Sequence, residues 1–144
     1  MRKLALASAI IIAAVAVGSV PFNTTLVPEW TVVVIDESGT PYANLEIVQS
    51  CESYTFSVDL CGAEAQDRVK ATNRDGAVTF PERTIRLSLW SRVFRFVTNL
   101  ALLLAHGSFG TEAYLSTSGP QGFVRLDYVS GNPPDVFLVP RGNS

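Results

Sequence analysis

The residues that could perform acid–base chemistry in this chain are few. His106 is its only histidine, and imidazole is the one side chain whose ordinary pKa lies near neutrality. No Ser or Cys motif accompanies it, and a histidine at the end of an apolar helical segment can interact with the last carbonyls of that helix. Gly-x-Ser-x-Gly, a phosphate-binding glycine loop and Cys-x-x-Cys do not occur. The sequence therefore predicts a protein that is not an enzyme, with no catalytic residue and no cofactor.

Acidic residues supply the next candidates, because carboxylates can bind metal ions. Asp36, Glu37, Asp75 and Glu112 can be brought together only by folding, and the Asp-x-Asp-x-Asp-Gly spacing of a calcium loop is absent. We therefore predict no metal site. The formal net charge is −2, and the basic residues form neither a long run nor a basic and aromatic stripe. We accordingly expect no nucleic-acid partner.

Two cysteines carry the remaining candidate chemistry. Cys51 and Cys61 lie ten positions apart, in a segment that meets an oxidising compartment if the chain is exported, and cysteines usually pair there. We predict a disulfide, which for so short a loop stabilises the fold by about 2–3 kcal/mol. The alternative is a pair of reduced, buried cysteines. Since Tyr54, Phe56 and Val58 alternate with polar residues, the disulfide is expected to join the ends of a short extended segment.

The first twenty residues indicate export. Arg2 and Lys3 precede an apolar run from Leu4 to Val20 that is interrupted only by small residues, which is the layout of a signal peptide. The run has 17 residues, close to the lower limit for crossing a hydrocarbon core of about 30 Å, so an uncleaved membrane anchor is the alternative. We predict a periplasmic or extracellular protein, either released or membrane-anchored.

The rest of the chain is mainly β in pattern. Residues 21–28 are polar and bounded by prolines, so they are expected to form a linker, and the folded domain is expected to occupy residues 29–144. In that range, short runs of β-branched, aromatic or alternating residues end at turn-forming residues, as at 36–41. The clearest hairpin is predicted at 73–76, where Gly76 supplies the positive φ of a tight turn. About seven strands result, the pattern of a β-sandwich.

One segment has helical periodicity instead. Near residues 89–105, apolar residues recur at intervals of three and four, and the polar residues fall on the opposite side. Ser88 is placed to cap the start of this helix, and Gly107 can end it. The predicted face for a membrane or a partner includes Trp90, Arg92, Phe94 and Arg95. It would suit an anionic membrane surface. The alternative is that the apolar stripe covers an open face of the sandwich and the arginines stay in water.

Two stretches contain closely spaced turn residues between strand-like runs. Residues 34–47 have Gly39 and Pro41 in the turn, and residues 72–81 have the pattern Thr-x-x-x-Gly-x-x-x-Phe. Together they resemble the carboxypeptidase-regulatory-like branch of the transthyretin-like superfamily, and in particular its uncharacterised exported bacterial members. The resemblance implies a transthyretin-like (Ig-like) β-sandwich, here with one inserted amphipathic helix. Because no activity is assigned to that subgroup, it leaves the function open.

The same superfamily contains a hydrolase of 5-hydroxyisourate. The end of this chain matches the Tyr-Arg-Gly-Ser terminus of that enzyme only superficially, because Pro140 stands in place of the Tyr and Asn143 is inserted before the Ser. The sequence therefore predicts a non-catalytic extracytoplasmic binding or structural module with a protein, envelope or carbohydrate partner. The alternative is a peripheral membrane protein held by the amphipathic helix, by an uncleaved N-terminal segment, or by both. A weaker alternative is a small-molecule hydrolase.

Overall fold

The computed structural model describes residues 2–62, 67–106, 110–119 and 122–141, and these residues are mainly β. They form two helices and ten strands, more strands than the predicted seven, partly because short strands flank the turns. The elements are α1 (Arg2–Ser19), β1 (Pro21–Val27), β2 (Trp30–Ile35), β3 (Glu46–Ser53), β4 (Val58–Asp59), β5 (Val69–Ala71), β6 (Ala77–Phe80), β7 (Arg83–Ser88), α2 (Leu89–His106), β8 (Thr111–Gly119), β9 (Gly122–Asp127) and β10 (Val136–Leu138).

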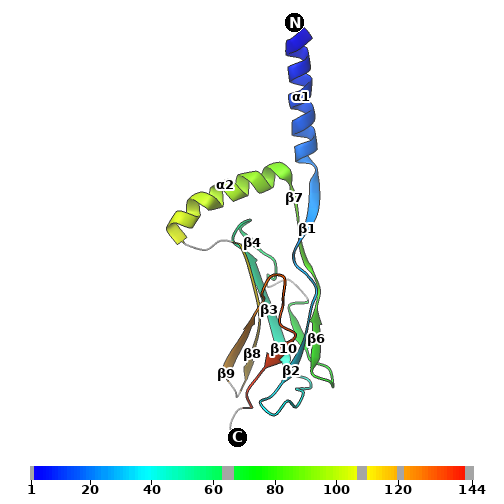
Figure 1. Ribbon diagram of the computed structural model, residues 1–144, viewed down its shortest axis with the longest axis vertical. Coiled ribbons are helices and arrows are strands. Elements are labelled where there is room, and N and C mark those ends of the chain that lie inside the picture. Colours follow the sequence, from blue (N-terminus) through cyan, green and yellow to red (C-terminus); the bar gives the residue numbers. More distant parts are fainter. Residues whose placement is uncertain (1, 63–66, 107–109, 120–121, 142–144) are drawn as a thin grey trace.

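Eight strands form two sheets, and the remaining two form a separate ribbon (Figure 1). The smaller sheet has the order β10-β2-β6, with β10 parallel and β6 antiparallel to β2. The larger sheet is antiparallel and has the order β4-β3-β8-β9, and β5 also pairs with β3. This arrangement is consistent with the predicted β-sandwich.

The core lies between these two sheets. Alternate residues of β2 point inward, with Trp30 1 % exposed and Val32 and Val34 fully buried, although the strand is apolar at every position except Thr31. Strands of both sheets contribute to one cluster of buried side chains: Trp30, Val32, Val34, Ile47, Val78, Phe80, Leu115, Phe137 and Val139. The buried indole of Trp30 donates a hydrogen bond to the carbonyl of Pro134 at 2.8 Å, so its polar group is satisfied.

The predicted linker at residues 21–28 is wrong, because residues 21–27 form β1. This strand pairs antiparallel with β7, from Pro21 opposite Ser88 to Val27 opposite Arg83. Pro21 starts the strand and Pro28 lies beyond its end, so neither proline interrupts the ladder. Helix α1 leads directly into β1, and β7 leads directly into α2. Because the start of β1 pairs with the end of β7, the end of α1 lies beside the start of α2 (Figure 1).

The turn predicted at residues 73–76 is confirmed, but the two strands that flank it do not pair with each other as a hairpin requires. Gly76 has φ +74°, and its N–H donates to the carbonyl of Asn73 at 3.1 Å. However, β5 pairs with β3 while β6 pairs with β2, so the turn passes the chain from one sheet to the other. A Cβ at Gly76 would lie 2.6 Å from the carbonyl oxygen of Val34, which explains the need for glycine here.

The extended segment predicted between the cysteines is also wrong. Strand β3 ends at Ser53, residues 54–57 turn, and β4 pairs back onto β3. A continuous strand of ten residues would separate its ends by about 33 Å, whereas the Cα atoms of Cys51 and Cys61 lie 5.2 Å apart. The disulfide therefore requires the chain to reverse between its two cysteines.

Candidate functional site

The predicted helix near residues 89–105 is confirmed as α2, and so is its cap. The N–H of Ser91 donates to the hydroxyl of Ser88 at 3.2 Å, which satisfies one of the free donors of the first turn. Gly107 and the side chain of His106 lie outside the described residues.

The large apolar residues of α2 up to Leu100 are exposed, although Val93 and Phe96 also border a pocket with Phe56 of the turn after β3. Phe94 is 73 % exposed and Val97 59 %. We call the α2 apolar face the set of residues whose exposure lies between 43 % and 73 %: Leu89, Trp90, Val93, Phe94, Phe96, Val97 and Leu100. Over residues 89–100, the part of α2 whose side chains the structure describes, the stripe therefore does not complete the core of the sandwich.

Arg92 fastens the opposite side of α2 to the ribbon. Its Nε donates to the carbonyl of Leu87 at 3.2 Å and its Nη2 to the carbonyl of Phe22 at 2.8 Å. Its guanidinium also lies 4.0 Å from the centroid of the Phe22 ring, within the range of a cation–π interaction. The alternative in which this arginine only stays in water overlooked these contacts, because Arg92 supplies donors to two backbone carbonyls.

Arg95 and Asn99 fasten α2 to the turn after β3. The Nη1 of Arg95 donates to the carbonyl of Phe56 at 2.6 Å. The side-chain amide of Asn99 donates to the carbonyls of Tyr54 and Thr55 at 2.8 Å each. Backbone carbonyls in a covered turn need donors, and the polar side of α2 provides them. This requirement turns the polar side of the helix toward the sandwich and leaves its apolar side outward.

Helix α1 is also apolar and exposed, and it meets α2 at one close contact. A Cβ at Gly18 would lie 2.3 Å from the Nε1 of Trp90, so only glycine permits this approach. The same Nε1 donates to the carbonyl of Val15 at 3.3 Å. Figure 1 shows α1 projecting away from the sheets, while α2 runs across the same end of the molecule. Within the described part of the chain, neither helix combines the length and hydropathy expected of a membrane span.

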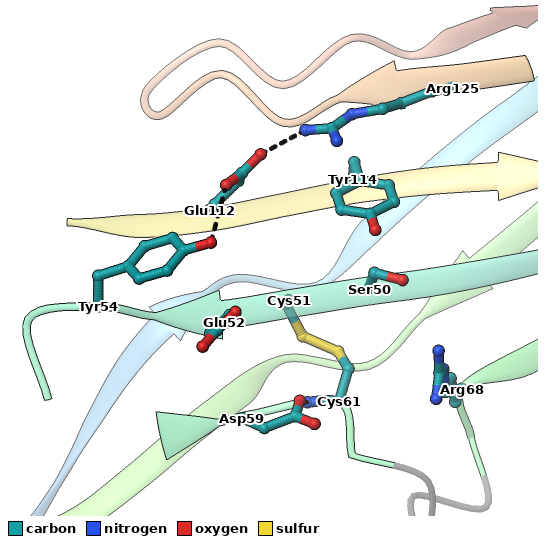
Figure 2. A pocket seen from close by; sticks show the side chains of 10 residues that line it. All are labelled: Ser50, Cys51, Glu52, Tyr54, Asp59, Cys61, Arg68, Glu112, Tyr114 and Arg125. Carbon is teal, nitrogen blue, oxygen red and sulfur yellow. Dashed lines mark hydrogen bonds and ion pairs between the residues drawn. A yellow bond between two sulfur atoms is a disulfide. The ribbon is translucent and has the colours of Figure 1, made fainter. Parts of the chain in front are cut away.

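A polar cleft of about 340 Å³ lies on the larger sheet (Figure 2). Its side chains come from β3, β4 and β8, from Arg125 of β9 and from the chain near the disulfide. They are Ser50, Cys51, Glu52, Tyr54, Asp59, Cys61, Arg68, Glu112, Tyr114 and Arg125. The sequence analysis did not predict this cleft. It expected one extended segment between the cysteines, whereas β3 and β4 are separate strands that pair with each other.

Charges within the cleft are partly paired. Arg125 forms ion pairs with Glu112 and Asp127, and its guanidinium lies 3.7 Å from the centroid of the Tyr114 ring. The hydroxyl of Tyr54 donates to Glu112 at 3.5 Å. The negative charges of Glu52 and then Glu112 raise the pKa of Tyr54 above its ordinary value.

The predicted disulfide between Cys51 and Cys61 is confirmed, and it lines one wall of the cleft. Cys51 is 4 % exposed and Cys61 2 % exposed. The bridge belongs to a second buried cluster with Val27 of β1 and Ala113 of β8. It therefore helps to hold the ribbon against the larger sheet.

No family model, curated protein or solved structure matches this chain. The resemblance to transthyretin-like proteins accordingly stays a prediction.

The acidic candidates of the sequence occupy different environments. Asp36 is 4 % exposed and accepts hydrogen bonds at 2.8 Å from the N–H groups of Ser38 and Thr40. The Nε of Arg141 lies 2.8 Å from its other oxygen. The hydroxyl of Ser38, the N–H of Thr40 and the nearby charge of Arg141 lower the pKa of Asp36. This carboxylate therefore stabilises the turn after β2, whereas Glu112 lines the cleft. Among the described residues, no three potential ligands group around a metal position.

Proposed function

We propose that this protein is a non-catalytic extracytoplasmic module that lies on a lipid bilayer through the α2 apolar face. The observation that carries the proposal is the orientation of α2: its polar side is bonded to the fold and its large apolar side chains face outward. Exposed apolar residues scattered singly are normal, but a contiguous exposed patch marks an interaction surface. An amphipathic helix with such a face can bury it at the boundary between head groups and acyl chains.

A bilayer fits this surface better than a protein partner, because two apolar surfaces meet at the same end of the molecule. Besides the α2 apolar face, α1 exposes large side chains such as Ile12 at 68 % and Val17 at 74 %. The helices diverge from their contact at Trp90 (Figure 1), so one partner protein would have to follow both. A bilayer can accept one helix in its plane and the other away from that plane. Trp90, at the junction, has the amphipathic ring that is enriched at membrane interfaces.

The attachment is expected to be mainly hydrophobic. Arg92 and Arg95 donate to backbone carbonyls of the fold, so they contribute little to contacts with lipid phosphates. An anionic membrane therefore binds this surface only slightly better than a neutral one. Screening by salt weakens attraction between charges and leaves apolar burial intact.

The part of the protein that α2 attaches to the bilayer is proposed to be a transthyretin-like sandwich of an exported protein. The two facing sheets, the disulfide and the apolar N-terminal helix support this assignment. Attachment through α2 leaves the far end of the sandwich, with the turn at 36–41, directed away from the bilayer (Figure 1). That end and the outer faces of the sheets are the surfaces proposed for a protein, envelope or carbohydrate partner.

Flotation with lipid vesicles tests the attachment. A form starting at Pro21 removes α1, which contacts the described fold mainly through α2. This form is expected to float with neutral phosphatidylcholine vesicles, and to do so still in about 0.5 M salt. Replacing Phe94 and Val97 together by Asp places two charges on the apolar face and is expected to abolish flotation.

Phe123→Asp is the matched control, because Phe123 is 68 % exposed on β9, outside the proposed surface. This variant is expected to float like the parent form. The proposal fails if the folded form starting at Pro21 stays at the bottom of the gradient with every vesicle. It also fails if the double Asp variant floats as well as its parent.

A further inference from the structure

The carbonyls that orient α2 lie in a loop of the chain that the disulfide closes. We call residues 52–60, which the two cysteines enclose, the disulfide loop. Asn99 of α2 is only 9 % exposed, and its side-chain amide donates to the carbonyls of Tyr54 and Thr55 in this loop. Its side-chain oxygen accepts from the hydroxyl of Ser57 at 3.1 Å. The buried amide of Asn99 therefore depends on the disulfide loop for its partners.

The disulfide loop has weak support of its own. Strand β4 has two residues and pairs with β3 at two positions, Ser53 with Val58 and Glu52 with Asp59 (Figure 2). The second pair sets like charges directly opposite each other, which destabilises the pairing of the strands. None of residues 54–60 is buried, so the loop adds no fully buried side chain between Ser53 and the second cysteine. The buried disulfide is the covalent link that holds the returning end of the loop to β3.

We propose that the redox state of this disulfide controls how α2 is held. In the oxidised chain the disulfide loop is closed, its carbonyls meet the polar side of α2, and the α2 apolar face is turned outward. When the bridge is reduced to two thiols, the returning half of the loop leaves β3, and the donors of Arg95 and Asn99 lose their fixed acceptors. The two sheets keep their own core, and Arg92 still holds the start of α2 to the ribbon.

The reaction is an exchange between one disulfide and one dithiol. A dithiol reductant gives two electrons and two protons to the bridge, the bond between the sulfurs of Cys51 and Cys61 breaks, and the reductant becomes a disulfide. In the reverse direction an oxidising disulfide accepts the electrons and protons, and the loop closes. Oxidising compartments favour the closed form. The inference rests on the proposed function only for its consequence, which is that the oxidised chain presents the α2 apolar face to a bilayer.

Thiol–disulfide exchange with dithiothreitol tests the inference on the full chain, held in a maltoside detergent without lipid. The equilibrium is approached from the oxidised and from the reduced protein, the thiols are alkylated, and the reduced fraction is measured by mass. Because coupling between two sites is reciprocal, α2 stabilises the disulfide as much as the disulfide stabilises the position of α2. Asn99→Ala removes the bonds of α2 to two carbonyls of the disulfide loop. It is therefore expected to shift the equilibrium about tenfold toward the reduced form.

Thr72→Val is the matched control, because Thr72 is also buried and its hydroxyl donates to the carbonyl of Tyr42, outside the disulfide loop. This variant is expected to keep the exchange equilibrium of the parent chain. The inference is overturned if Asn99→Ala leaves the equilibrium unchanged, which would show that α2 and the disulfide are independent. It is also overturned if Thr72→Val shifts the equilibrium as much as Asn99→Ala, because reduction would then unfold the whole protein. Neither result would affect the outcome of the flotation test with neutral vesicles.

Discussion

Two sets of large apolar side chains in this protein have the same chemistry and opposite surroundings. Those between the two sheets, such as Trp30 and Phe80, are at most 5 % exposed. Those of the α2 apolar face are between 43 % and 73 % exposed, and Phe94 and Val97 are the most exposed of them. The difference arises on the polar side of α2, where arginine and asparagine donors meet carbonyls of the fold. Which side of an amphipathic helix faces its own protein is thus decided by the partners available to its polar groups.

The largest expected effect contrasts these two sets directly. Phe80→Ala removes a fully buried ring from the core and is expected to lower the free energy of unfolding by about 3–5 kcal/mol. Val97→Ala on α2 is expected to change it by less than about 0.5 kcal/mol, because the side chain is mostly in water. Urea unfolding followed by intrinsic fluorescence measures both. A Val97→Ala loss as large as that of Phe80→Ala would show that the α2 apolar face is buried in the folded protein.

A smaller change in the free energy of unfolding is expected at Arg92, which joins α2 to the ribbon. Arg92→Ala removes two hydrogen bonds from a charged donor and the cation–π contact with Phe22. The loss is expected to cost about 1–3 kcal/mol and to loosen α2 from the ribbon. Hydrogen exchange of the amides of α2 measures the loosening, which is expected to exceed any change in the two sheets.

Arg86→Ala is the control for this change, because Arg86 is an exposed residue of β7 in the same ribbon. Exchange in α2 is expected to stay the same in that variant. If the amides of α2 exchange at the same rate in the Arg92→Ala and Arg86→Ala variants, the contacts of Arg92 do not hold the helix.

The periodicity of the sequence predicts more of the sandwich than of the cleft or of the helix orientation. A run of β-branched and aromatic residues locates β2, whose inward residues meet apolar residues of the other sheet. Strand β1 has no such pattern, since backbone pairing with β7 and not burial forms most of it. The limits of α2 follow from its own spacing and cap. Its orientation depends on carbonyls of residues 54–57, which lie more than thirty positions earlier in the chain.

The polar cleft could not be predicted from the sequence either, because it depends on which residues of neighbouring strands lie opposite each other. Nothing in the spacing of Glu52, Asp59 and Glu112 along the chain indicates that they share a row, because the row is created by pairing β3 with two other strands. The distance that a disulfide can bridge is the one signal in the sequence that points toward this pairing. Once Cys51 and Cys61 are bonded, the segment between them must reverse, and a short β4 beside β3 is a simple way to do so.

The smallest expected effect concerns the turn after β2, at the end of the sandwich far from α2. The pKa of Asp36 is lowered in the folded state, first by the hydroxyl of Ser38 and then by the N–H of Thr40. A carboxylate with a lowered folded pKa stabilises the fold fully above its unfolded pKa, which is about 3.9, and this contribution is lost as the pH falls through the folded pKa. The protein is therefore expected to lose stability below about pH 4.

Asp36→Asn is expected to remove this part of the pH dependence, because an amide does not titrate, and to leave a variant whose stability at neutral pH is lower than that of the parent. Glu37→Gln, at the neighbouring exposed position, is the control and is expected to keep the pH profile of the parent. Thermal unfolding between about pH 2 and pH 7 measures both profiles. An unchanged profile in Asp36→Asn would show that the contacts of Asp36 are not the source of the acid sensitivity.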